Sequence, residues 1–96
     1  MIQTQFINWL LDTKDTSVLT LNNIGKDYFS DYEKEFEFIQ QHISEYNNVP
    51  DKETFINKFP DFDLIKVTET PQYLLSELLL DKQKRMLAKA FFYLVQ

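Results

Sequence analysis

The stretch from Tyr28 to Phe59, YFSDYEKEFEFIQQHISEYNNVPDKETFINKF, decides the fold because its apolar residues recur at alternating spacings of four and three. This spacing places them on one stripe of an α-helix. The stripe consists of Tyr32, Phe36, Ile39, Ile43 and Tyr46. Ser30 and Glu33 have the S-x-x-E form of a capping box, which predicts a helix from Asp31 to about Tyr46. A helix with one apolar stripe needs other helices to cover it.

The residues before this helix predict two shorter elements. Apolar side chains at helical spacing indicate a helix from about Ile2 to Thr13, and residues 17–22 read as a short helix or turn. Because Asn and Gly tolerate a left-handed backbone, residues 22–25 should end that element. Phe29 stands just before the capping box, where Lys34 would be a poor apolar partner, so we expect Phe29 to point into the core.

The residues after the central helix predict a short helix and a connection. Pro50 should end the central helix, because the residue before a proline is pushed out of helical space. Asp51 is a suitable N-cap for a short helix over residues 52–59. Residues 61–68 should then form an extended connection, since their β-prone side chains have no partner strand.

The last predicted helix is unusually long. Thr70 as N-cap and Pro71 as the first helical residue predict a helix of about 25 residues that ends at Gln96. Apolar residues cover more than half of its circumference up to its end, so one face can pack on the domain while the others need partners. We therefore expect the chain to be a fragment of a longer protein. We expect a partner interface along this helix, formed by Leu75, Leu79, Leu87 and Phe91. The alternative is that these four residues are ordinary core residues.

Together these elements predict an all-α fold, a small bundle of about five helices with a long C-terminal helix. Residues 1–96 should form a single domain, in which residues 1–70 make the helical core and residues 71–96 the long helix. Nine Phe, five Tyr and one Trp supply bulky side chains for a core. The absence of Cys excludes disulfides and thiolate metal sites. With no membrane-spanning run and no basic leader, we expect a cytoplasmic protein.

The charge of the chain favours protein partners. A net charge of −5 opposes the phosphate neutralisation on which nucleic-acid affinity depends, so we expect no direct nucleic-acid binding. We also expect no membrane partner and no small-molecule substrate. A local basic stretch should be a solvated helix face or a complement to an acidic partner, with phosphate contact as the weaker alternative. It consists of Lys82, Lys84, Arg85 and Lys89.

The sequence offers little material for catalysis. Its single glycine, Gly25, excludes the glycine-rich phosphate loops G-x-x-x-x-G-K-[ST] and G-x-G-x-x-G. His42 is the only histidine and should be a polar helix-face residue rather than a metal ligand. Glu33, Glu35 and Glu37 alternate around the helix, so their carboxylates should not converge. We therefore expect no catalytic residues, no metal site and no cofactor.

The order of these elements resembles the N-terminal domain of DnaB-type replicative helicases, particularly the divergent phage versions. The resemblance rests on five motifs taken in order: Phe6-Ile7-Asn8-Trp9-Leu10-Leu11, Tyr28-Phe29, Glu35-Phe36-Glu37-Phe38-Ile39, Val49-Pro50-Asp51-Lys52-Glu53-Thr54-Phe55 and Tyr73-Leu74-Leu75-Ser76-Glu77-Leu78. The chain departs from the family in two ways. The family's usual start has a Glu followed by a glycine-containing Leu-Gly-x-Leu run, whereas no glycine precedes Gly25 here, and only one arm of the family's helical hairpin is present.

The resemblance implies a non-catalytic domain in DNA replication. Such a domain would help to build the collar of a helicase ring by self-association and would contact primase or a helicase loader. The ATPase motor would lie in a separate domain beyond Gln96. Two other functions stay open. One is a stand-alone acidic adaptor or inhibitor, such as a phage protein, that binds a host protein through the long helix. The other is a small enzyme with dispersed carboxylates.

Overall fold

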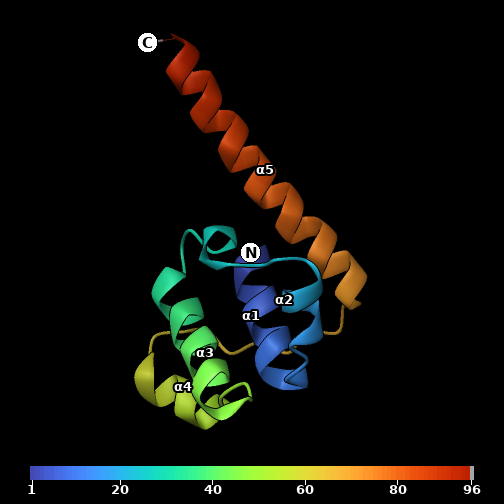
Figure 1. Ribbon diagram of the computed structural model, residues 1–96, viewed down its shortest axis with the longest axis vertical. Coiled ribbons are helices and arrows are strands. Elements are labelled where there is room, and N and C mark those ends of the chain that lie inside the picture. The colour runs from blue at the N-terminus through green and yellow to red at the C-terminus, as the bar shows by residue number, and fades with distance from the viewer. Residues whose placement is uncertain (96) are drawn as a thin grey trace.

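The computed structural model describes residues 1–95, with side chains described as far as Phe91. These residues contain five α-helices and one short 3-10 helix, and they contain no strand. The elements are α1 (Ile2–Thr13), α2 (Ser17–Leu21), η1 (Lys26–Tyr28), α3 (Glu33–Tyr46), α4 (Lys52–Lys58) and α5 (Pro71–Val95). This confirms the predicted all-α bundle with a long C-terminal helix (Figure 1). The predicted last residue of that helix, Gln96, lies outside the described residues.

Helix α1 is the centre of the core. Phe6, Ile7 and Leu10 on this helix have no exposed surface, and eight of its twelve residues are buried. Phe29 stacks on Phe36 of α3 with ring centroids 4.2 Å apart, and it also lies 6.0 Å from the ring of Phe6. The prediction that Phe29 points into the core is therefore confirmed. Its ring joins α1 to α3 through one aromatic cluster.

The predicted capping box at the start of α3 is wrong. The helix begins at Glu33, two residues later than expected, and its N-cap residue Tyr32 makes no side-chain capping hydrogen bond. Instead, the Ser30 hydroxyl accepts a hydrogen bond from the amide of Gln3 at 3.2 Å. The backbone N–H of Asp31 donates to the same Gln3 side chain at 3.0 Å. Contacts with α1 therefore fix this segment in place of the local cap.

The apolar stripe of α3 is buried only in its middle. Phe36 and Ile39 have no exposed surface, whereas Ile43 is half-buried and Tyr46 is 66% exposed. Helix α3 extends past the edge of the core. Its last turn is therefore outside the core, although the periodicity of the sequence alone would place it inside. Asn47 ends the helix with a left-handed backbone, φ 55°.

Several turn and cap predictions hold only in part. Asn23 adopts the expected left-handed backbone with φ 52°, but Gly25 is extended with φ −117°. Asp51 occupies the N-cap position of α4 without a side-chain cap, because its carboxylate pairs with Lys14 instead. At α5 the predicted cap is formed, since the backbone N–H of Tyr73 donates to the hydroxyl of Thr70 at 3.2 Å.

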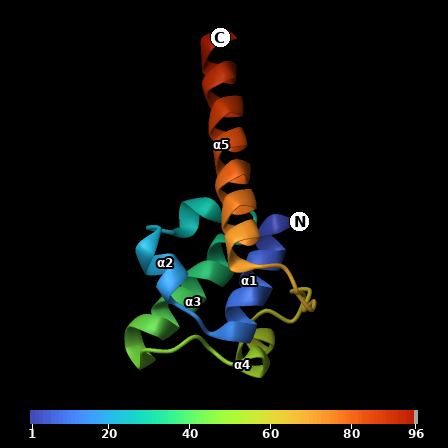
Figure 2. The same ribbon diagram turned by 90° about the vertical axis from the view of Figure 1, so that its right-hand side faces the viewer.

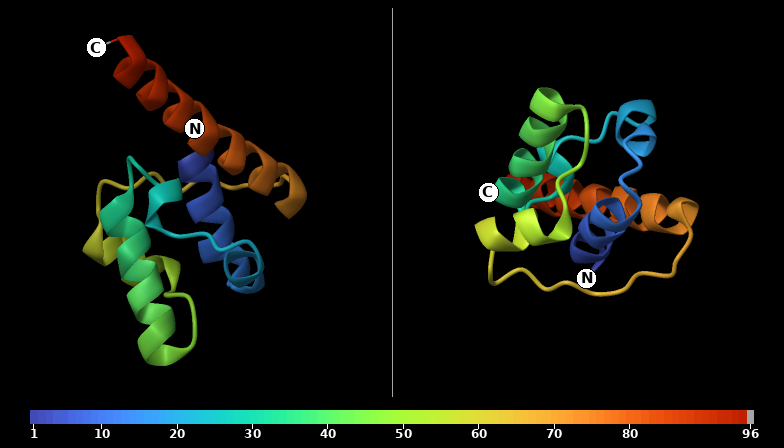
Figure 3. Two further views of the ribbon diagram at one scale, coloured as in Figure 1. Left: turned by 45° about the horizontal axis from the view of Figure 1, so that its top comes forward. Right: turned by 90° about the horizontal axis from the view of Figure 1, so that it is seen from below.

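An extended connection leads from α4 to α5, as predicted. Figure 3 shows it crossing from α4, along the side of α1, to the first turn of α5. The buried Asn8 of α1 holds it in place. The side-chain oxygen of Asn8 accepts a hydrogen bond from the backbone N–H of Ile65 at 2.9 Å, and the side-chain NH₂ of Asn8 donates to the backbone carbonyl of Asp63 at 3.0 Å. One side chain thus satisfies part of the backbone hydrogen bonding of this connection, which a neighbouring strand would otherwise provide.

Helix α5 extends well beyond the core. Figures 1 and 2 show its first turns crossing the core and its second half standing free above it. The Cα radius of gyration is 14.2 Å, whereas a compact chain of this length would have about 12–13 Å. The molecule measures 45 × 26 × 24 Å, and its long axis follows this projection. We call α5 the arm, its residues 71–85 the root and its residues 86–95 the free end.

Candidate protein-docking arm

Apolar packing holds the root of the arm on the core. Leu74 and Leu78 have no exposed surface, and Leu75 packs half-buried against the same cluster. Helix α1 is the main neighbour of α5. Two buried leucines one turn apart give a helix a fixed contact line, because residues at i and i+4 lie on one face.

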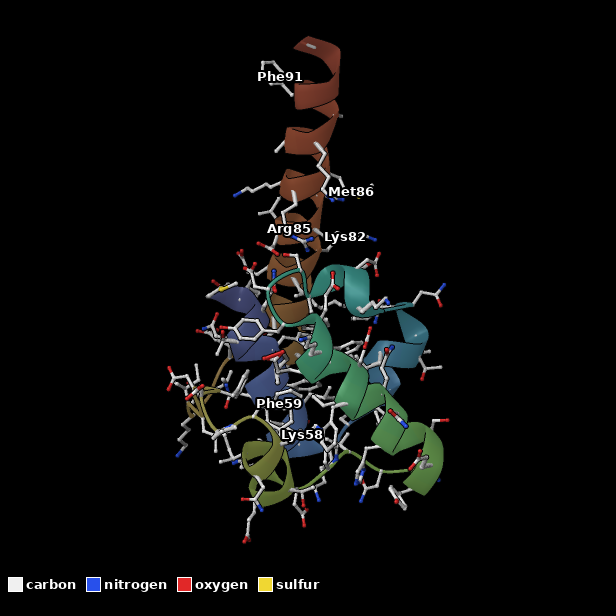
Figure 4. All side chains as sticks on the ribbon, turned by 90° about the vertical axis from the view of Figure 1, so that its left-hand side faces the viewer. Lys58, Phe59, Lys82, Arg85, Met86 and Phe91 are labelled. Carbon is white, nitrogen blue, oxygen red and sulfur yellow. The ribbon has the colours of Figure 1, made fainter. Side chains whose placement is uncertain are left out.

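Polar groups extend this contact past the last buried leucine. The Asp81 carboxylate accepts hydrogen bonds from the Gln3 amide at 3.1 Å and from the Arg85 guanidinium at 3.2 Å. The Arg85 guanidinium also donates to the backbone carbonyls of Asp27 and Tyr28, at 3.2 and 3.3 Å. Figure 4 shows Arg85 at the level where the arm leaves the core. These bonds join the arm to α1 and η1 at the same height.

An ion pair strengthens the same junction. The Lys82 ammonium lies 2.8 Å from the Asp27 carboxylate and 4.3 Å from the centre of the Tyr28 ring, a cation–π distance. The hydrogen bond from Lys82 holds the pKa of Asp27 below its usual value, and the same bond raises the pKa of Lys82. Both shifts favour the charged pair. We call Asp27, Asp81, Lys82 and Arg85, with Gln3, the polar clamp.

The basic stretch of the sequence is therefore divided between two environments. Lys84 and Lys89 are exposed, as a solvated face requires. Lys82 and Arg85 keep only 23% and 29% of their side chains exposed and bind η1 of the same chain. The prediction of a solvated face is wrong for these two residues, because the acidic partner of Lys82 is Asp27 of its own chain.

From Met86 to Phe91, the described side chains of the arm are mostly exposed. Met86 is 58% exposed, and Leu87 and Phe91 are each 69% exposed. Among the described side chains, residues 86–91 make no hydrogen bond or ion pair with the rest of the molecule. Figure 4 shows Met86 and Phe91 on the part of the helix that projects into open space.

One face of the arm carries a line of exposed apolar side chains, which Lys84 interrupts between Leu80 and Leu87. At about 100° per residue, four exposed apolar side chains fall within about 40° of one another, on the side of the helix opposite Leu74 and Leu78. We call them the outer stripe: Tyr73 at 48% exposure, Leu80 at 42%, Leu87 at 69% and Phe91 at 69%. Their spacings of seven, seven and four match a line of contact with a second helix.

The structure divides the four predicted interface residues. Leu87 and Phe91 belong to the outer stripe, and Leu79 is 43% exposed on the flank of the helix. Leu75 is half-buried against the core, on the other side of the arm from Phe91. The interface itself stays a prediction. Sequence reasoning missed Tyr73 and Leu80, although their seven-residue spacing to Leu87 is visible in the chain.

The candidate chemical groups lie in ordinary structural settings. The Nδ1 atom of His42 lies 2.8 Å from the carbonyl oxygen of Asn48, at the end of α3. Glu37 pairs with Lys26 at 3.1 Å on the surface. Within the described part of the chain, no three His, Asp or Glu side chains come close enough together to hold a metal ion.

Comparisons with known proteins give no relatives for this chain. No protein-family model, no curated protein and no solved structure matches it. The resemblance to helicase N-terminal domains therefore stays a prediction. Over the described residues, no helix is both long enough and apolar enough to cross a lipid bilayer.

Proposed function

We propose that this chain is a non-catalytic assembly and partner-binding domain that docks protein through the outer stripe of the arm. The observation that supports this most directly is the combination of a fixed root and an uncovered free end. The root is held by buried leucines and the polar clamp, while Leu87 and Phe91 stand 69% exposed on a projecting helix. Exposed apolar surface of this extent usually marks an interaction site.

The energy available from the outer stripe suits a reversible interface. Complete burial of a leucine or phenylalanine contributes about 1.5–3 kcal/mol. Leu87 and Phe91, two-thirds exposed, would thus contribute about 1–2 kcal/mol each, and the less exposed Tyr73 and Leu80 about 1 kcal/mol each. The sum, about 4–6 kcal/mol, is close to the cost of association itself. The stripe alone should therefore give weak binding that flanking contacts strengthen.

An apolar protein surface is a better partner for this stripe than nucleic acid. The chain has a net charge of −5, and two of its four arm cations are already engaged by its own residues. Nucleic-acid affinity depends on free cations that displace counterions from phosphate. Only Lys84 and Lys89 are exposed cations on the described arm, which favours a protein surface.

In its more specific form, our proposal is that this is the N-terminal domain of a DnaB-type replicative helicase. The ordered motifs of the sequence support it, and so does a helical core with one long projecting helix, because a ring collar needs such an arm for self-association. Primase or a helicase loader would be the further partners. The ATPase would then be encoded beyond Gln96.

Reading the coding sequence past Gln96 tests this specific form. A second helical segment, a linker and a G-x-x-x-x-G-K-[ST] motif after a strand would support the helicase proposal. A stop codon directly after Gln96 would contradict it. That result would favour the stand-alone acidic adaptor, which would use the same stripe.

Sedimentation equilibrium tests the general proposal. The expected result is an average mass that rises above the 11.6 kDa monomer between about 5 and 500 μM protein. The double variant Leu87→Gln, Phe91→Gln should remain monomeric, and glutamine keeps helix propensity high. Met86→Gln is the matched control, because Met86 is similarly exposed on another face. A wild-type protein that stays monomeric throughout would contradict the proposal.

A further inference from the structure

A second apolar surface lies between α3 and α4. It is an open groove of about 680 Å³, within the range of binding pockets, about 300–1,000 Å³. One wall comes from α3 and the other from α4 and the residue after it. The side chains used below are Phe38, His42, Glu45 and Tyr46 from α3, and Thr54 and Phe59 from the α4 side.

Three aromatic rings and the imidazole of His42 line one part of this groove, and its other six lining residues are polar or charged. Phe38 and Phe59 meet edge to face with centroids 5.7 Å apart, and His42 lies 4.8 Å from the ring of Tyr46. Phe38 and Phe59 pack against the core from its outside, and Tyr46 is 66% exposed. Such a wall favours an aromatic or aliphatic side chain, because edge-to-face ring pairs add about 0.5–1.5 kcal/mol to area burial.

The arm of the same chain does not reach this groove. Figure 4 shows Phe59 on the core and Phe91 near the top of the arm, far apart along the long axis. The arm is a single continuous helix, and its root is fixed by Leu74, Leu78 and the polar clamp. The occupant of the groove is therefore not the described arm of the same molecule.

Charge favours a second copy of this chain as that occupant. Residues 1–70 carry six Lys and 13 Asp or Glu, a net charge of −7, whereas residues 71–96 carry four Lys or Arg and two Asp or Glu, a net charge of +2. The core and the arm are thus of opposite sign. The lining of the groove itself holds two acidic residues, Glu37 and Glu45, and two basic ones, Lys34 and Lys58, so the attraction is between the core as a whole and the arm. On the described arm, Lys84 and Lys89 are exposed, and Lys84 lies on the same side of the helix as Phe91.

We propose that the free end of the arm, centred on Phe91, docks into the α3–α4 groove of a second copy of this chain. This inference rests on the proposed function and specifies its partner surface. Phe91 would enter the aromatic walls of the groove, and the basic arm would lie against the acidic core of the other molecule. Docking would bury both the apolar free end of one molecule and the aromatic groove of the other, which are exposed in the monomer.

Such an interface is head-to-tail, and this has a definite consequence. Each molecule offers one arm and one groove, so docking leaves a free arm at one end of the pair and a free groove at the other. Heterologous contacts of this kind produce closed rings or open filaments instead of a closed dimer. A contact between two outer stripes related by a two-fold axis would instead stop at the dimer.

The test mixes two variants that each lose one half of the interface. The arm variant is Phe91→Gln. The groove variant is Tyr46→Arg, with Thr54→Arg as a second version on the opposite wall, and both place a cation where the basic arm should dock. Tyr46 and Thr54 are exposed, so these variants should keep the circular dichroism spectrum and melting temperature of the wild type.

The expected masses by sedimentation are specific. Wild type should exceed the mass of a dimer at high concentration, and each variant alone should associate at least tenfold more weakly. An equimolar mixture should form a one-to-one heterodimer and nothing larger, because the intact arm of one variant fills the intact groove of the other. Groove variants that assemble as wild type, beside a monomeric arm variant, would overturn this inference and leave the proposed function standing. A monomeric wild type would remove both.

Discussion

Replacing Leu78 by alanine should destabilise the fold strongly, whereas the same replacement at Leu87 should have almost no effect on the monomer. The two residues have the same chemistry and lie on the same helix, so they differ in burial alone. Leu78 has no exposed surface and Leu87 is 69% exposed. The pair therefore measures directly where the core stops covering the arm.

The expected magnitudes follow from this burial. Leucine-to-alanine changes at fully buried sites cost about 2–5 kcal/mol, since they lose transfer free energy and leave a cavity. Surface substitutions usually stay within about 0.5 kcal/mol, and alanine is a slightly better helix former than leucine. In a domain of this size, the loss at Leu78 should lower the melting temperature by roughly 10–30 °C, at about 4–8 °C per kcal/mol.

Urea unfolding followed by circular dichroism is the suitable assay. It should be performed at about 5 μM protein, so that association of the arm contributes little to stability. The midpoint shift multiplied by the slope gives the change in free energy of unfolding. A loss below about 0.5 kcal/mol at Leu78 would refute the packing of the root, and a loss above about 2 kcal/mol at Leu87 would refute the uncovered free end.

Three further predictions concern polar groups. Gln3→Leu should cost about 1–3 kcal/mol in chemical denaturation, because it removes three partly buried hydrogen bonds that contribute about 0.5–1.5 kcal/mol each. Thr70→Ala should cost about 1 kcal/mol and Ser30→Ala less than half of that, since only Thr70 forms a helix cap. Lys82 lowers the pKa of Asp27 in the folded state, so the stability from this pair is complete above pH about 4 and is lost as pH falls through the folded pKa. Lys82→Met should therefore lose less stability than the wild type between pH about 5 and 3.

The contrary results are equally clear. A neutral Gln3→Leu would mean that its hydrogen bonds contribute nothing net to the fold. Equal effects at Thr70 and Ser30 would restore the capping box that the structure lacks. Parallel pH curves for the wild type and Lys82→Met would remove Asp27 from the acid-sensitive groups.

The helix positions could be predicted from sequence because local signals and tertiary packing agree there. Helix α1 has the predicted ends, and the cap at Thr70 fixes the start of α5. The start of α3 could not be predicted, since the amide of Gln3 competes for Ser30 and Asp31 through contacts 27 and 28 residues apart. A local motif does not reveal such a distant competitor.

The candidate site could be predicted only in part for a related reason. An excess of apolar residues on the last helix indicated an interface, but it did not show which face the core would cover. The covered face is set by the packing of Leu74 and Leu78 on the core. This packing turns the side chain of Leu75 toward the core and the side chain of Phe91 away from it. The polar clamp was not predictable, because it pairs residues of α5 with η1 and α1 over more than 50 positions.

Hydrogen exchange of the α5 backbone amides, measured at low and high protein concentration, tests the central claim most directly. Amides of residues 75–85 should be protected at both concentrations, because the core holds the root. Amides of residues 86–91 should exchange quickly at about 5 μM and become at least tenfold slower at about 500 μM, as docking covers the free end. Equal exchange of residues 86–91 at both concentrations would contradict the claim that this arm docks a second molecule.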